Sequence, residues 1–105
     1  MKFLAITRNK DTYYMLPPET RVEVMDGGFA FVDKYRKTGK CKDIYFAADL
    51  KGGVSIWEVE SGEEAARLML ENPQLPFIDI DIQPIVEWDA GMKVLAEYRE
   101  KLAEK

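Results

Sequence analysis

Strand-like and helix-like hydrophobic spacings alternate along this chain in an order that few folds accommodate. Apolar residues with the spacing typical of β-strands occur over residues 2–8, 41–48, 54–59 and 77–82. Helical spacing fills the interval between the first and second of these segments, and again the interval between the third and fourth. Strand, helix, strand, strand, helix, strand is the order of the split βαβ arrangement. We therefore predict an α+β, ferredoxin-like βαββαβ fold, with a C-terminal helix over residues 88–105.

The first helix is predicted to begin at Pro17-Pro18 and to end at Thr38-Gly39, because proline suits a first helical turn and glycine suits the position after the last. Residues 9–16 before it are predicted to be a loop. Gly27 and Gly28 interrupt the helical pattern, and each costs about 1 kcal/mol relative to alanine inside a helix. The pair therefore either weakens this helix or marks a turn between two shorter ones.

The second helix carries a recognisable start. Ser61 is followed three residues later by Glu64, which is the spacing of a capping box, and the helix is predicted to run to about Glu71. In the strand that follows, Ile78, Ile80 and Ile82 share one face because side chains alternate along a strand.

A chain of 105 residues has room for one core, so residues 1–105 are predicted to form a single domain, of a size that a partner subunit often completes. The N-terminal apolar run is too short for a secretory signal, and no segment approaches the ~18 apolar residues of a membrane span. Cys41 is the only cysteine, which excludes an intrachain disulfide and suits a reducing compartment. These features predict a cytoplasmic protein without a membrane partner.

The charge and the missing residue types exclude several classes of function. A net charge of −4 disfavours binding to nucleic acid, which requires a basic surface. The chain has no histidine, so it has neither a histidine-based triad nor a histidine-ligated zinc site. A single cysteine holds no thiolate cluster, and no acidic loop suggests a magnesium site. We expect no metal and no cofactor, so acid–base chemistry falls to Asp, Glu, Tyr, Lys, Arg or Cys41.

Two segments in the second half of the chain resemble the muconolactone isomerase family. They are Gly52-Gly53-Val54-Ser55-Ile56-Trp57-Glu58-Val59-Glu60-Ser61 and Asn72-Pro73-Gln74-Leu75-Pro76-Phe77-Ile78-Asp79-Ile80-Asp81-Ile82-Gln83-Pro84. The resemblance covers about residues 39–86 and extends more weakly through the first helix. It implies a dimeric α/β barrel, in which the sheets of a homodimer pack face to face, sometimes within a larger ring. It also implies a pocket between the sheet and its helices, and a reaction that moves a lactone double bond by proton abstraction and return, without metal or cofactor.

The resemblance is lost in the region that is catalytic in the muconolactone isomerase family. The family has a charged Arg-Glu-Lys type of run in the first helix, where this chain has Gly27-Gly28-Phe29. The family's C-terminal His-Pro pair is also missing, since Val86-Glu87-Trp88 occupies that region. Muconolactone itself is therefore not the expected substrate. Small proteins of this fold also act as cyclases or condensation auxiliaries in polyketide and pyrrole-pigment pathways such as prodiginine biosynthesis.

Asp26 is the predicted proton-transfer group, because Gly27 and Gly28 leave room for a ligand beside its carboxylate. A carboxyl group removed from water suits acid–base work. Met25 and Phe29 flank these positions and are predicted to contact the substrate together with the two glycines. The alternative is a helix kink in which Asp26 is a solvated cap residue.

Three tyrosines and one arginine are further predicted to orient the substrate or to wall the pocket. Tyr13 and Tyr14 precede the first helix, where aromatic rings with hydroxyls can hold a ring or a carbonyl. Tyr45, expected on the same strand face as Cys41, would donate a hydrogen bond to a developing oxyanion. Arg8 at a strand end would bind a carboxylate or enolate. Each has a structural alternative: loop packing for the first pair, core or interface for Tyr45, and a surface ion pair for Arg8.

The sequence thus predicts a cofactor-independent isomerase, cyclase or condensation-assisting enzyme for a small cyclic intermediate, with Asp26, Tyr45 and Arg8 as its catalytic residues. One alternative is a non-catalytic ligand-binding or interaction domain, which filling of the pocket by Phe29, Met25 and Tyr14 would favour. Another is a cofactor-free monooxygenase, which the absence of histidine and the expected core position of Trp57 disfavour.

Overall fold

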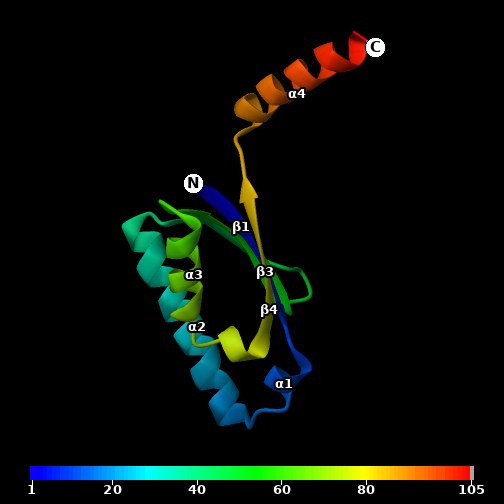
Figure 1. Ribbon diagram of the computed structural model, residues 1–105. Helices are drawn as coiled ribbons and strands as arrows, with labels where there is room; N and C mark the ends of the chain where they lie inside the picture. The colour runs from blue at the N-terminus through cyan, green and yellow to red at the C-terminus, as the bar shows by residue number, and fades with distance from the viewer. Residues whose placement is uncertain (105) are drawn as a thin grey trace.

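The computed structural model describes residues 1–104, which contain a four-stranded antiparallel sheet with the strand order β2-β3-β1-β4 (Figure 1). The elements in chain order are β1 (Lys2–Asn9), α1 (Asp11–Tyr14), α2 (Pro18–Thr38), β2 (Cys41–Phe46), β3 (Gly52–Glu58), α3 (Gly62–Leu70), the 3-10 helix η1 (Leu75–Phe77), β4 (Ile78–Ile85) and α4 (Trp88–Ala103). Helices α2 and α3 cover one face of the sheet. The predicted ferredoxin-like βαββαβ fold with a C-terminal helix is confirmed.

The core lies between the sheet and these two helices. Phe3 on β1 and Trp57 on β3 are almost fully buried, and their rings stack with centroids 6.1 Å apart. The Trp57 indole N–H donates to the buried Ser55 hydroxyl at 2.7 Å, so its polar atom is satisfied inside the core. The predicted core position of Trp57 is confirmed. The isoleucines of β4 also pack as predicted: Ile78 is buried, and Ile80 and Ile82 pack against the core.

The opposite face of the sheet is only partly covered. Leu4 and Ile6 alternate with the buried residues of β1, and both are half-buried. They lie beside Ile56 and Val54 of β3, their partners in the register. This face therefore carries an apolar strip on β1 and β3, beside the polar residues Asp81 and Gln83 of β4, and no second layer covers it within residues 1–104.

Helix α2 is continuous across Gly27 and Gly28, so a turn at this pair is ruled out. A Cβ atom at Gly27 would lie 2.8 Å from Cγ of Pro73, and one at Gly28 would lie 2.6 Å from Nε2 of Gln74. The glycines thus let the segment after α3 approach the α2 backbone closely. The helix ends as predicted at Gly39, whose φ of 81° is left-handed. The loop predicted before it is wrong in part, because residues 11–14 form the short helix α1.

A bulge in β2 changes which residues share a face. Cys41 pairs with Trp57, whereas Tyr45 pairs with Val54, and the register shifts between Cys41 and Asp43. Trp57 and Val54 are three residues apart in β3 and so point to opposite faces. The prediction that Tyr45 shares a strand face with Cys41 is therefore wrong, because alternation breaks at a bulge.

The capping box of α3 is present, since the Ser61 hydroxyl accepts from the Glu64 backbone N–H at 3.1 Å. Strand β4 runs to Ile85, three residues beyond its predicted end, and pairs with β1 over its whole length.

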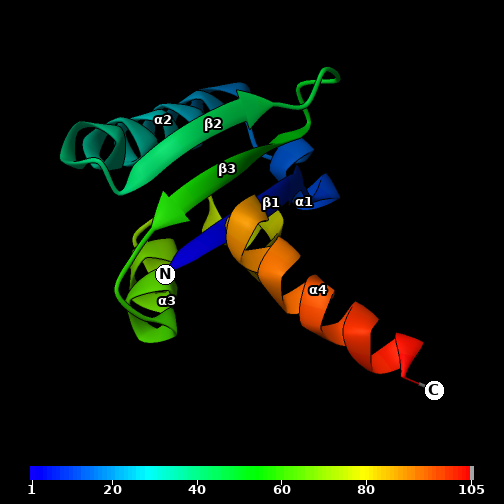
Figure 2. The same ribbon diagram turned by 90° about the horizontal axis from the view of Figure 1, so that it is seen from above.

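Helix α4 leaves the sheet at the end of β4 and points away from the other elements (Figures 1 and 2). The radius of gyration is 17.4 Å, whereas a compact chain of this length has about 13 Å. Lys2 of β1 forms an ion pair with Glu87, next to the start of the helix. No helix among residues 1–104 has the length and apolar character needed to cross a bilayer. That residues 1–105 form one domain stays a prediction.

Candidate functional site

A cavity of about 930 Å³ lies between α2 and the sheet. Most of the surface that lines it is apolar, and its polar groups come from β1, α1, α2, β2, β3 and the segment after α3. Its lining includes Ala5, Thr7, Asn9, Tyr13, Tyr14, Arg21, Met25, Gly28, Phe29, Phe31, Val32, Asp33, Arg36, Tyr45, Phe46, Ser55, Trp57, Asn72, Gln74, Ile78 and Ile80. Cavities with apolar walls and a few convergent polar groups are the usual form of a small-molecule site. This cavity is therefore the candidate active site.

Tyr13 and Tyr14 form an aromatic wall of the cavity. Their rings meet edge to face with centroids 5.1 Å apart, and Asn9 Nδ2 donates to the Tyr14 hydroxyl at 3.0 Å. Tyr13 is buried, and burial raises the pKa of its hydroxyl, with a smaller opposing effect from the charge of Arg21. Tyr13 therefore remains protonated at neutral pH and is available as a hydrogen-bond donor.

Arg21 is a cavity residue that the sequence reasoning missed. It lies in the first turns of α2, and its Nη2 donates to the carbonyls of Tyr14 and Leu16, both at 3.3 Å. Its Nε atom is buried and has no hydrogen-bond partner among residues 1–104. A buried guanidinium donor without a partner is costly.

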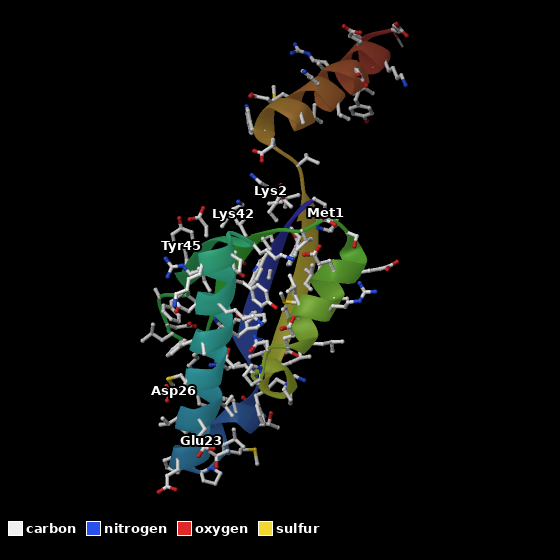
Figure 3. All side chains as sticks on the ribbon, turned by 90° about the vertical axis from the view of Figure 1, so that its left-hand side faces the viewer. Met1, Lys2, Glu23, Asp26, Lys42 and Tyr45 are labelled. Carbon is white, nitrogen blue, oxygen red and sulfur yellow. The ribbon has the colours of Figure 1, made fainter. Side chains whose placement is uncertain are left out.

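Asp26 does not lie where it was predicted. Its side chain is exposed on α2 (Figure 3) and is not part of the cavity lining. The expected carboxylate removed from water beside a ligand does not describe Asp26 in this structure, because its side chain is exposed. Asp33, about two turns further along on the same side of α2, is the acidic residue among those that line the cavity; its carboxylate is exposed and forms an ion pair of 3.1 Å with Lys37.

The guanidinium of Arg8 is bound to the carboxylate of another residue, Asp49. Its Nη1 and Nη2 atoms donate to the two carboxylate oxygens of Asp49 at 3.2 and 2.9 Å, and it is not part of the cavity lining. The same contact holds the pKa of the Asp49 carboxyl below its usual range. The structural alternative, a surface ion pair, describes Arg8 as observed. Tyr45 lies on the edge strand β2 (Figure 3) and borders the cavity, and the residue is 61% exposed.

Of the residues on α2 that were predicted to contact the substrate, all but one line the cavity. Met25, Gly28 and Phe29 line the cavity, and the Phe29 ring meets that of Phe46 edge to face at 6.2 Å. Gly27 packs against Pro73 outside the lining. Met25, Phe29 and Tyr14 border an open cavity, so the filling that would favour a non-catalytic domain is not observed.

Cys41 is buried, and burial raises the pKa of its thiol, with a smaller opposing effect from Arg36. It is therefore a packing residue in its neutral form and a poor nucleophile. No group of three or more His, Cys, Asp or Glu side chains within residues 1–104 is placed to hold a metal ion.

Comparison with known proteins places the chain among enzymes of the same fold. The profile of the family Muconolactone delta-isomerase matches residues 1–90. The muconolactone delta-isomerase of Rhodococcus opacus is 26% identical over 78 residues, which span 74% of this chain and 84% of that protein. A crystal structure of muconolactone isomerase superposes with a TM-score of 0.72 and 18% identity, covering 83% of this chain and 90% of the other.

A second solved structure shares the fold. It is 5-chloro-2-hydroxyhydroquinone dehydrochlorinase from Burkholderia phenoliruptrix AC1100 in complex with 2,5-dihydroxybenzoquinone, with a TM-score of 0.65 and 15% identity over 86% of this chain and 98% of that one. The family profile matches residues 1–90, so it covers every described element except most of α4. The chain belongs to the muconolactone delta-isomerase family.

Proposed function

We propose that this chain is a cofactor-independent isomerase or cyclase that binds a small, unsaturated ring compound in the cavity between α2 and the sheet. Family membership supports an isomerase or a related enzyme of small molecules. The observation that carries the proposal is the cavity itself, about 930 Å³ with aromatic walls and a buried, unpartnered guanidinium donor. Such a site suits a flat ring that bears oxygen groups.

The polar residues of the cavity suit a proton shift. Asp33 is proposed as the group that takes a proton from the ring carbon next to a carbonyl and returns it to a carbon further along the double-bond system. The electron pair of the broken C–H bond moves onto the carbonyl oxygen, which becomes an enolate. Tyr13 and Arg21 are proposed to stabilise that oxygen, the first as a neutral donor and the second as a cation.

Asp33 and Asp26 give two distinct versions of this proposal. Asp26 is exposed outside the lining, so it would reach a substrate only if the N-terminal half of α2 moved. Both side chains are exposed, but Asp33 is among the residues that line the cavity, and its partner Lys37 is one turn away on the same helix. We therefore favour Asp33, and the comparison of the two variants is part of the test below.

The substrate is proposed to be a small oxygenated ring. The relatives are named for a lactone and for a chlorinated hydroquinone, and one is solved with a dihydroxybenzoquinone. Pyrrole-pigment and polyketide intermediates are also unsaturated rings with carbonyl groups, and they remain candidates alongside lactones. The aromatic wall formed by Tyr13 and Tyr14 is compatible with all of these rings.

The chain is also proposed to act as a homodimer or larger homo-oligomer. The open face of the sheet carries Leu4, Ile6, Val54 and Ile56, and no element within residues 1–104 covers it. A second copy of the same face would bury these side chains in an isologous, two-fold contact. The position of α4, away from its own sheet, supports a further contact with another copy (Figure 2).

Helix α4 has an apolar stripe suited to such a contact. Five large side chains recur at helical spacing on one side and are all well exposed: Trp88, Met92, Leu95, Tyr98 and Leu102. A helix of 16 residues is about 24 Å long, so this stripe offers roughly 240 Å², whereas a stable interface buries about 800 Å² per partner. The helix alone is therefore too small, and the proposal requires the sheet face as well.

The test of function combines binding and turnover. Native mass spectrometry and thermal-shift measurements on the whole chain would be run with unsaturated lactones, aromatic polyketide intermediates and pyrrole aldehydes, and turnover would be followed by NMR. We expect one class to raise the unfolding temperature and to be converted. Asp33→Asn is expected to retain binding and to lose turnover at least about a hundredfold, the usual contribution of a general base.

Asp26→Asn is the matched control, because it makes the same substitution on the same helix outside the cavity. If Asp26→Asn abolishes turnover and Asp33→Asn does not, the assignment of the base to Asp33 is wrong. Ligand binding without conversion by the unmodified protein would contradict the enzyme proposal and favour a ligand-binding domain. Conversion only in the presence of oxygen would favour the monooxygenase alternative.

A further inference from the structure

The side chain of Gln74 lies directly against the backbone of α2. A Cβ atom at Gly28 would be 2.6 Å from its Nε2 atom and 2.7 Å from its Oε1 atom, which is closer than real contacts allow. The amide group therefore occupies the volume of the missing side chain at position 28. Both residues line the cavity, although they are far apart in the sequence.

The backbone around Gln74 is held in place by short-range hydrogen bonds. Its N–H donates to the Asn72 side chain at 2.9 Å, and its carbonyl accepts from the Phe77 N–H at 2.8 Å. The Leu75 N–H donates to the Asn72 carbonyl at 3.0 Å. This turn fixes where the side chain leaves the backbone, so the amide is positioned before any ligand binds.

The polar atoms of the amide remain available. The hydrogen bonds of this turn use the backbone of Gln74. Its side-chain amide forms no hydrogen bond with any other group of residues 1–104. A glutamine amide presents an acceptor oxygen and a donor NH₂ side by side. Its complement is a ligand edge with one donor and one acceptor on adjacent atoms.

We propose that Gln74 is a specificity-determining residue that recognises a ring bearing a donor next to an acceptor, and that Gly28 is required to place it. Such edges are found on cyclic amides, on rings with a hydroxyl beside a carbonyl, and on pyrroles with a neighbouring carbonyl group. The inference rests on the proposed function, since it names the substrate class of the same cavity. It adds a residue and a chemical requirement that the proton shift itself does not need.

The test compares two probes that differ only at this edge. 2-Quinolone has an N–H beside its carbonyl, and N-methyl-2-quinolone has the same ring with the donor blocked. By isothermal titration calorimetry of the whole chain, we expect 2-quinolone to bind about tenfold more tightly, the effect of one or two net hydrogen bonds. Gln74→Leu, of similar size, should bind the two probes equally.

Gly28→Ala provides a second and independent variant. Its methyl group would displace the amide, so it should also lose the preference between the probes although Gln74 is intact. Gly62→Ala is the control, because a Cβ at Gly62 meets no atom within 4 Å, and it should keep the tenfold preference.

The outcomes separate this inference from the proposed function. If the unmodified protein binds both probes equally, or if Gln74→Leu keeps the preference, the inference is overturned while the cavity remains a binding site. If the unmodified protein binds neither probe and no other ring compound of the panel, the proposed function itself fails.

Discussion

The Tyr35 hydroxyl donates a hydrogen bond to the Glu71 carboxylate, and it lies 2.7 Å from each of the two carboxylate oxygens. Tyr35 is buried on α2, and Glu71 is the C-cap residue of α3. The contact joins the two helices three residues before Gln74. It therefore helps to hold the turn that places the Gln74 amide on Gly28.

This contact predicts a pH dependence of stability. The Tyr35 hydroxyl holds the pKa of the Glu71 carboxyl below its usual range, with smaller contributions from Lys34. The unfolded chain therefore binds more protons than the folded one below about pH 4.3, the ordinary glutamate value. The stability that this group provides is complete above that pH and is lost as the pH falls through the lowered pKa of the folded state.

Glu71→Gln should flatten the acid limb of a plot of unfolding free energy against pH, measured by urea denaturation. It should not abolish that limb, because Asp49 and Glu64 also have lowered pKa values through Arg8 and Lys40. Glu63→Gln is the control, since Glu63 forms only an exposed ion pair with Arg67. An acid limb equally steep in Glu71→Gln and the unmodified protein would contradict this account.

Ser55→Ala should destabilise the protein by about 1–3 kcal/mol, because it leaves the buried Trp57 indole N–H without an acceptor. The measurement is equilibrium urea unfolding followed by tryptophan fluorescence. The origin of the effect is tested by adding Ser55→Ala to Trp57→Phe, which has no indole N–H. In that background the serine substitution should cost clearly less, and an unchanged cost would show that the hydrogen bond is not the cause.

Cys41 should react slowly with iodoacetamide in the folded protein at pH 8. Its thiol is buried, and burial raises its pKa, so few molecules carry the reactive thiolate. Alkylation followed by mass spectrometry should become fast in urea, where the thiol is exposed. Rapid alkylation of the folded protein, without unfolding, would contradict the assignment of Cys41 to packing.

Charge introduced into the α4 stripe should weaken the proposed homo-oligomer. Leu95→Glu places a carboxylate among the exposed apolar residues of this helix, so analytical ultracentrifugation should show a larger fraction of monomer. Glu97→Lys, on the charged side of the same helix, should leave the distribution unchanged. A monomeric unmodified protein at micromolar concentration would refute the oligomer proposal.

Much of the architecture could be predicted because its signals are local. The Ser61–Glu64 capping box, the glycine after the first helix and the alternating isoleucines of β4 each act over a few residues. The core position of Trp57 followed from the resemblance to the muconolactone isomerase family. The bulge in β2 was missed, because a one-residue register shift depends on pairing with β3 rather than on the sequence of β2 itself.

The site was predicted less well because its polar groups come together only in the folded chain. Gln74 meets Gly28 across 46 positions of the sequence, and neither residue alone indicates the contact. One signal was available: Arg21, Met25, Gly28 and Val32 recur at helical spacing, which places them on the same side of α2. Reading that face would have identified Arg21.

The central claim is that the cavity catalyses a proton shift on an unsaturated ring. It is tested most directly by incubating the protein with α-angelica lactone in D₂O and following deuterium incorporation by NMR. The account expects incorporation next to the carbonyl well above the buffer rate, abolished by Asp33→Asn and retained in Asp26→Asn. Incorporation at the buffer rate, from a protein shown by native mass spectrometry to bind the lactone, would contradict it.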